Sequence, residues 1–279
     1  MKTNNFTKMS GAGNDFVLID KKINPKFEAT PNNIKKLCAR RTGIGADGLL
    51  IIEDNPTHSF SMNYFNSDGS TGTLCGNGAR CAIKYANVSG RIKNEKSKFL
   101  CHDVEYTCQV FETGDVQFHL NDPEEYKSLI KLDVFSCKID ASFIDTGSPH
   151  VVIRVEDIHN CDEKTRLNNL DVHKIGAYIR HHNEFAPGGT NVNFIDIVGN
   201  NLYIRTFERG VEEETLACGT GSVAAAVIGA KKYGLLPPVD VITRSGAKII
   251  VNFNLRGEEV SEVSMIGPAE IIYNGEFNI

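Results

Sequence analysis

Short apolar segments bounded by Gly, Asn, Asp or Pro recur along the whole chain and are typical of β-strands. Several alternate apolar with polar residues, as VQFHL and LYIRTF do, which is the period of a half-buried strand. The step VGNNLYI indicates a hairpin turn. The segments predicted as strands are 16–20, 48–53, 60–65, 104–111, 116–120, 150–155, 193–198, 202–207, 247–253, 260–266 and 268–274.

Four other segments have the apolar periodicity and the end signals of helices. The last of them is apolar nearly all round, which indicates a helix buried on every side. They are 30–43, with Thr30 as its N-cap, 75–87, 171–183, with Asp171 as its N-cap, and about 219–233.

Each half of the chain therefore holds several strands, an edge helix and one apolar helix. This arrangement predicts an α+β fold of two pseudo-symmetric lobes, each a mostly antiparallel sheet or barrel around a central helix, with an active site in the cleft between them. We expect an N-terminal lobe over 1–125, to which the last strand within 267–279 returns, and a C-terminal lobe over 126–266. The charged stretch 121–140 is expected to hold the first crossing between the lobes.

Composition and charge narrow the class of protein. The 279 residues are 41% hydrophobic and 23% charged, which is ordinary for a globular protein, and the net charge is -5. No basic block is present, so nucleic acid and anionic membranes are not expected as partners. No apolar run is long enough to span a membrane and the N-terminus has no signal core, so we expect a cytoplasmic protein.

The eight cysteines form no CxxC pair and no zinc-binding spacing, so no metal is expected and most should be reduced. Six fit the role of small buried hydrophobic residues: Cys38, Cys81, Cys101, Cys108, Cys137 and Cys161. Cys75 and Cys218 differ, because each directly precedes a Gly-x-Gly step at the start of an apolar helix.

A cysteine at a helix N-terminus is suited to proton transfer. The unpaired N–H groups and the helix dipole lower the pKa of the thiol and also bind carboxylates. Two such helix starts facing one another would place a sulfur on each side of an α-carbon, so that a thiolate removes a proton from one face and a thiol returns one to the other. A redox disulfide and two unrelated buried cysteines are the alternatives that spacing alone leaves open.

The chain resembles the diaminopimelate epimerase family over essentially its whole length. The resemblance rests on ordered motifs: MSGAGNDFVLID at 9–20, RRTGIGADGLL at 40–50, YFNSDGSTGTLCGNGARC at 64–81, TGSPHVV at 146–152, GTNVNF at 189–194, RTFERGVEEETLACGTGS at 205–222 and GPAEIIYNGEF at 267–277.

The resemblance implies an isomerase that interconverts LL- and meso-diaminopimelate, in lysine and peptidoglycan precursor biosynthesis, without pyridoxal phosphate, metal or another cofactor. It implies Cys75 and Cys218 as the acid/base pair, with His150 and Glu208 modulating cysteine pKa, and a homodimer whose contact involves Tyr273. The substrate-binding positions that it implies are Asn14, Asn66, Gly76, Asn77, Asn191, Glu208, Arg209, Gly219 and Thr220.

Two positions depart from the family pattern. Many members have Gln where this chain has Gly48 after Asp47, and many have Asn where it has Ser148 before Pro149. Both departures affect expected substrate contacts rather than the proton chemistry.

Other functions remain as alternatives. A proline racemase or hydroxyproline epimerase would use the same paired cysteines, but the amides and Arg209 favour a substrate with a second amino acid group. A non-catalytic amino-acid-binding protein and a thiol redox protein on the same fold are alternatives from other classes.

Thiol reactivity tests whether the helix starts stabilise thiolate. Cys75 or Cys218 should be alkylated at a lower pH than an ordinary thiol of pKa about 8.5, because the helix N-terminus stabilises thiolate. Alkylation followed by peptide mass spectrometry across a pH series measures each site. Reactivity of both that rises only near the ordinary thiol pKa would contradict thiolate stabilisation.

Overall fold

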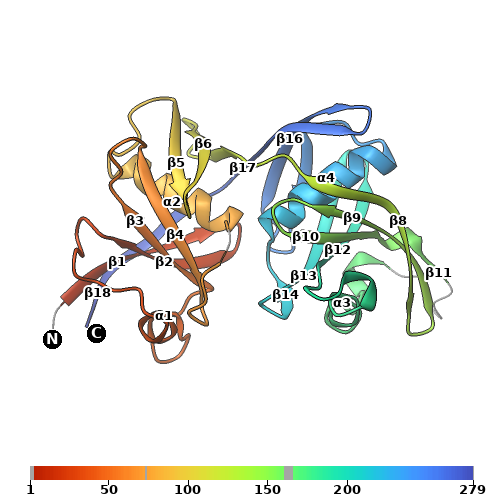
Figure 1. The fold of residues 1–279 in the computed structure, drawn as a ribbon, viewed down its shortest axis with the longest axis horizontal. Helices are drawn as coiled ribbons and strands as arrows, with labels where there is room; N and C mark the ends of the chain where they lie inside the picture. The colour runs from red at the N-terminus through yellow and green to blue at the C-terminus, as the bar shows by residue number, and fades with distance from the viewer. Residues whose placement is uncertain (1–2, 73, 160–165, 279) are drawn as a thin grey trace. The chain divides into compact units, whose positions relative to one another are not determined.

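The chain folds into two units, each of which combines a sheet with two α-helices (Figure 1). The computed structural model describes residues 3–72, 74–159 and 166–278. The first unit is Met1–His119 with Ile266–Ile279, and the second is Leu120–Met265. The boundary at 119/120 lies six residues before the expected one at 125/126.

In the first unit a mixed, mostly antiparallel sheet has the strand order β18–β1–β2–β3–β4–β5–β6–β7. The pairs β2/β3 and β4/β5 are parallel, and the other neighbours are antiparallel. The strands are β1 (Thr3–Gly11), β2 (Asn14–Asp20), β3 (Gly48–Glu53), β4 (Phe60–Asn66), β5 (Lys96–Cys101), β6 (Val104–Val110), β7 (Val116–His119) and β18 (Glu270–Asn278).

Helix α2 (Gly76–Val88) lies at the centre of this unit. It contacts β18 and β1 at one end of the strand order and β6 and β7 at the other, so the sheet wraps around it. Helix α1 (Pro31–Cys38) packs on the outer face of β2 and β3 through Ile34 and Leu37. Because helices cover both faces of these strands, each reads as a continuous apolar run.

The second unit has the strand order β8–β9–β10–β12–β13–β15–β16. Helix α4 (Gly219–Tyr233) contacts six of these strands and α3 (Val172–Arg180) packs on β12 and β13. The strands are β8 (Glu124–Val134), β9 (Cys137–Asp145), β10 (Pro149–Arg154), β11 (Ile158–His159), β12 (Asn191–Val198), β13 (Asn201–Glu208), β14 (Glu213–Thr215), β15 (Val239–Ile242), β16 (Lys248–Arg256) and β17 (Glu259–Gly267).

The two units repeat one topology. The order β1–β2–α1–β3–β4–α2–β5–β6 in the first corresponds to β9–β10–α3–β12–β13–α4–β15–β16 in the second. The parallel pairs also correspond, β2/β3 with β10/β12 and β4/β5 with β13/β15. The expected α+β class, the mostly antiparallel sheet and the central helix of each half are therefore confirmed.

The stretch 121–140 differs from the expectation. Instead of a crossing alone, it contributes β8 and the start of β9, which form an antiparallel hairpin. Its apolar residues Ile130, Leu132 and Val134 are buried, while the charged residues between them are exposed. Apolar and charged residues alternate visibly in the sequence of β8, but the high charge of the stretch favoured its interpretation as a connection.

Other strands were missed for related reasons. β1 and β5 contain polar residues that the sheet buries, including Asn4, Lys8 and Ser97. The turn expected within 198–204 is confirmed, since Val198 pairs with Asn201 across a two-residue hairpin turn. Of the helices in the described ranges, none is both long and apolar enough to cross a membrane.

The packing of α3 on β13 gives a testable prediction. A Cβ at Gly176 would lie 2.5 Å from Cβ of Phe207, which is fully buried. Gly176→Ala should therefore lower the free energy of unfolding by about 1–3 kcal/mol through overpacking, although alanine normally stabilises a helix interior by about 1 kcal/mol. Urea unfolding measures the change, and a raised midpoint would contradict this close approach.

Candidate active site

The two cysteines singled out from the sequence occupy equivalent places. Cys75 is the N-cap of α2 and Cys218 is the N-cap of α4, both with extended backbone (φ -92°, ψ 114° and φ -120°, ψ 116°). The predicted helix starts are thus confirmed. Since the first N–H groups of a helix have no intrahelical acceptor, each sulfur lies at a helix end that favours negative charge.

The second glycine of each Cys-Gly-x-Gly step lets its helix dock on the strand beside it. A Cβ at Gly78 would lie 3.0 Å from Leu50 of β3, and one at Gly221 would lie 2.5 Å from Oδ1 of Asn193 of β12. β3 and β12 are corresponding strands of the repeat. The repeated glycine therefore has a packing cause in both units.

Cys218 belongs to a polar chain that includes His150. The Sγ of Cys218 lies 3.6 Å from Oγ1 of Thr220, which in turn lies 2.9 Å from Nε2 of His150. Ser148, one of the departures from the family pattern, places its Oγ 3.0 Å from the same Nε2. Ser148 therefore takes part in this row of hydrogen-bonded groups despite its short side chain.

Asn193, which was not expected from the sequence, fixes the tautomer of His150. Its amide nitrogen lies 3.1 Å from Nδ1 of His150 and donates to the carbonyl of Val151. Because an amide nitrogen only donates, Nδ1 accepts and the proton of the neutral ring is on Nε2. His150 can then donate to Thr220, whose hydroxyl hydrogen is left to point at Cys218.

His150 is neutral in the folded protein. The side chain is fully buried, and burial, followed by the positive charge of Arg209, lowers the pKa of His150 to about 3. This agrees with its place as an uncharged donor rather than a cation beside Cys218.

Asn191, Glu208 and Arg209 lie together at one end of β12 and β13. Asn191 donates to the carbonyl of Pro149 at 2.9 Å and accepts from the backbone N–H of Arg209 at 2.9 Å, so its amide ties the start of β10 to the end of β13. Glu208 accepts from the hydroxyl of Thr215. In this structure the side chain of Asn191 holds the backbone of Pro149 and Arg209 in place. Its amide keeps one further N–H donor and one further lone pair.

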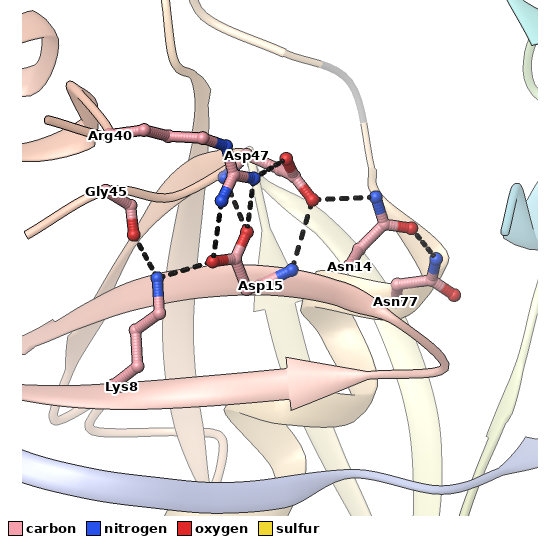
Figure 2. A network of polar contacts seen from close by, with 7 residues as sticks. All are labelled: Lys8, Asn14, Asp15, Arg40, Gly45, Asp47 and Asn77. Carbon is pink, nitrogen blue, oxygen red and sulfur yellow. Dashed lines mark hydrogen bonds and ion pairs between the residues drawn. The ribbon is translucent and has the colours of Figure 1, made fainter. Parts of the chain in front are cut away.

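Asn14 and Asn77 meet in the first unit (Figure 2). Nδ2 of Asn77 donates to Oδ1 of Asn14 at 2.6 Å, and Nδ2 of Asn14 donates to Asp47 at 3.0 Å. Arg40 bridges Asp47 to Asp15. Both candidate amides are therefore held in one orientation.

Charge anchors the far end of the network in Figure 2. Lys8, which is buried, pairs with Asp15 at 2.7 Å and donates to the carbonyl of Gly45. Burial raises the pKa of Asp15, but hydrogen bonds from Lys8 and Arg40 outweigh it and hold the pKa below its usual value. The carboxylate stays ionised, so the network persists at neutral pH.

Arg80 is a second residue that was not expected from the sequence. It is fully buried on α2 and donates to Oδ1 of Asn77 at 2.7 Å, to the carbonyl of Gly76 at 3.3 Å and to that of Pro268 at 3.4 Å. An arginine between Ala79 and Cys81, near the start of the helix, was the available signal.

Asn66 lies in a different hydrogen-bonded group at the end of β4, with Tyr64 and Ser70 as partners. It is paired in register with Gly48, the other departure from the family pattern. In each unit the expected residues thus gather at one end of the sheet, next to the helix start: Asn14, Asn66, Cys75, Gly76 and Asn77 in the first, and His150, Asn191, Glu208, Arg209, Cys218, Gly219 and Thr220 in the second.

The other cysteines are mostly as expected. Cys38, Cys81, Cys101 and Cys108 are buried free thiols, and burial raises the pKa of Cys101 and of Cys108 to about 12. Cys137 was expected to be a small buried hydrophobic residue, but it is only partly buried and is disulfide-bonded. Cys161 lies outside the described residues.

Solved structures share the fold of this chain. A phenazine biosynthesis protein of the PhzF family from Bacillus anthracis matches with a TM-score of 0.74 at 15% identity, covering 100% of both chains. A hydroxyproline epimerase from Agrobacterium vitis matches with a TM-score of 0.70 at 12% identity, covering 98% of this chain and 92% of the other. At such identities the likeness concerns the fold alone.

Sequence comparison gives the family. The model for diaminopimelate epimerase matches residues 6–120 and 142–272. The diaminopimelate epimerase of Chlorobaculum tepidum is 41% identical over 97% of this chain and 100% of its own length. That of Aquifex aeolicus is 38% identical over 98% and 97%. The chain belongs to the diaminopimelate epimerase family, and the expected family and isomerase class are confirmed.

The buried neutral His150 predicts how stability depends on pH. An unfolded histidine of pKa 6.5 takes up a proton as the pH falls, while folded His150 does not until about pH 3. The free energy of unfolding is therefore unaffected by this group above pH 6.5 and falls on acidification, by about 2 kcal/mol at pH 5.

Urea unfolding at pH 7 and pH 5 measures this loss. His150→Gln should lack that component, whereas the exposed His173→Gln, as a matched control, should keep it. The same pH dependence in His150→Gln as in the wild type would show that His150 is not held neutral.

Proposed function

We propose that the protein interconverts LL- and meso-2,6-diaminopimelate by moving the proton of one α-carbon, with Cys75 and Cys218 as the two acid/base groups. The observation that carries the proposal is that each thiol caps the central helix at the same point of a repeated topology. Membership of the family supports the choice of substrate. The reaction has no redox step, and the proposal includes no metal or other cofactor.

The proton chemistry follows from the two helix starts. The thiolate of one cysteine takes the α-proton, and the electron pair of the C–H bond is delocalised into the adjacent carboxylate. The thiol of the other cysteine gives a proton to the opposite face, and the roles exchange in the reverse direction. Backbone N–H groups at Gly76, Asn77, Gly219 and Thr220 would stabilise the charge that accumulates on the carboxylate.

The polar chain from His150 supports thiolate at Cys218. His150 donates through Nε2 to Thr220, which leaves the threonine hydroxyl as a donor toward Sγ. A hydrogen bond to the charged form of a group lowers its pKa. His150 would therefore modulate Cys218 without itself carrying charge.

Charged and amide side chains would bind the rest of the substrate. Arg209 can hold the distal carboxylate with its planar fork, and Glu208 can pair with an ammonium group. Asn14, Asn66 and Asn191 each keep hydrogen-bonding capacity beyond their bonds in the structure. Such a set suits a substrate with an amino acid group at each end.

The rival functions require different chemistry. A cyclic imino acid, the substrate of a proline racemase or hydroxyproline epimerase, needs an apolar distal pocket instead of Arg209 and several amides. An amino-acid-binding protein without activity would bind diaminopimelate but not exchange its α-hydrogen. A thiol redox protein would instead join Cys75 and Cys218 in a disulfide.

The homodimer, the cytoplasmic location and the place in lysine and peptidoglycan precursor biosynthesis belong to the same proposal. Tyr273 lies on β18 with an exposed fraction of 46%, next to Ile272 at 51%. β18 pairs with β1, and Tyr273 packs edge-on against Phe6 with ring centroids 5.8 Å apart. Exposed apolar side chains on a strand suit a contact with a second copy.

Deuterium exchange at the α-carbon in heavy water tests the function. The wild type should exchange with inversion. Cys75→Ala and Cys218→Ala should each lower the rate of inversion by about 10²–10⁴-fold, because one proton transfer without the other cannot complete inversion. NMR and chiral chromatography of diaminopimelate measure exchange and inversion. Cys108→Ala is the matched control, since Cys108 is a buried thiol on β6 and does not cap a helix.

Two outcomes would contradict the proposal. If the reduced wild type does not exchange the α-hydrogen of diaminopimelate, then diaminopimelate is not its substrate, and proline-type substrates would be tested next. Full activity in either cysteine variant would rule out the two-base mechanism.

A further inference from the structure

The aromatic ring of Tyr64 lies between two glycines. A Cβ at Gly72 would lie 2.4 Å from Cδ1 and Cε1 on one edge of the ring, and a Cβ at Gly48 would lie 2.6 Å from Cε2 on the other edge. The ring of Phe16 packs against it edge-on, with centroids 6.2 Å apart. Any side chain at either glycine would have to displace the ring.

The hydroxyl of Tyr64 orients a candidate substrate ligand. Tyr64 donates to Oδ1 of Asn66 at 2.9 Å, and Nδ2 of Asn66 donates to Ser70 at 3.0 Å. Ser70 in turn donates to Asp68 at 2.6 Å. The amide oxygen therefore faces the phenol and the amide nitrogen faces the serine, with one N–H and one lone pair remaining for a ligand.

The register of β3 and β4 explains the grouping. Tyr64 and Asn66 are two residues apart on β4 and share one face of the sheet. On β3, Leu50 is paired with Tyr64 and Gly48 with Asn66. Gly48 is therefore the diagonal neighbour of Tyr64, and the missing side chain at 48 is the space that the ring fills.

We propose that Tyr64 is a positioning residue of the substrate site: its hydroxyl holds the amide of Asn66 in the orientation that binds substrate, and Gly48 and Gly72 make room for its ring. This rests on the proposed function, because Asn66 is taken as a substrate ligand. The glycine that departs from the family pattern is thus one part of a set, Gly48, Tyr64 and Gly72, in which a phenol occupies the space of a side chain at 48.

Tyr64→Phe tests the hydroxyl while it keeps the ring. The KM for diaminopimelate should rise about fivefold, the effect of losing one ordinary hydrogen bond, and kcat should change less than twofold, because both cysteines and helix starts are intact. Steady-state kinetics in both directions measure the split. Tyr203→Phe on β13, the strand that corresponds to β4, is the matched control for an exposed tyrosine and should leave KM unchanged.

A double-variant cycle separates positioning from packing. Asn66→Ala should raise KM, and adding Tyr64→Phe to it should raise KM no further, because the hydroxyl acts through the amide. Equal effects of Tyr64→Phe with and without Asn66 would overturn the proposal. So would an unchanged KM in Tyr64→Phe alone, which would leave the tyrosine a packing residue.

Gly72→Ala provides a second, independent test. Its methyl group should push the ring away and raise KM at least as much as Tyr64→Phe, although the hydroxyl is still present. In a Tyr64→Ala background the same change should have no further effect on KM. A normal KM in Gly72→Ala would contradict the proposed need for space.

The wild-type assay separates the proposed function from the proposed role of Tyr64. If the wild type epimerises diaminopimelate and the Tyr64 variants behave like it, the inference fails and the function stands. If the wild type does not act on diaminopimelate while the cysteine alkylation and unfolding results are normal, the function fails and the inference fails with it.

Discussion

The docking of a helix N-terminus against a strand of its own sheet is the contact on which each half of the candidate site depends. A thiol buried in a protein interior resists ionisation, and the N–H groups of a helix start that have no intrahelical acceptor, fixed at short range, oppose that effect. Gly78 and Gly221 allow this close approach because a Cβ at either would meet the neighbouring strand. The same docking brings the ends of the adjacent strands, and the polar side chains that they carry, next to the sulfur.

The polar groups around the helix starts act mainly on one another. Asn193 sets the tautomer of His150, Arg80 holds Asn77, and Asp47 holds Asn14. Each bond removes a rotational freedom before any ligand arrives, so less conformational entropy would be lost on binding. The two units achieve this differently: the first uses ionised Asp15 and Arg40, and the second uses a neutral imidazole.

The sequence predicted the parts of the molecule whose signals are local. The helix starts after Cys75 and Cys218 follow from glycine spacing and apolar periodicity, and the family follows from ordered motifs. Arg80, Asn193 and Tyr64 could not be found in that way, because their roles depend on partners that are distant in sequence or across a strand register. The hairpin within 121–140 was missed since its charged residues alternate with apolar ones, and Cys137 could not be assigned because disulfide pairing depends on the fold.

The pairing of β18 with β1 has a consequence for synthesis of the chain. The first and last strands lie side by side, with both termini at the same end of the first unit (Figure 1), and Phe6 packs against Tyr273 and Phe277. The second unit is thus an insertion, continuous in sequence, within a unit whose sheet closes only when the final strand has been made. During synthesis on a ribosome the second unit can therefore fold completely while the first unit still lacks its last strand. This reverses the usual N-terminal-first folding order of multidomain proteins.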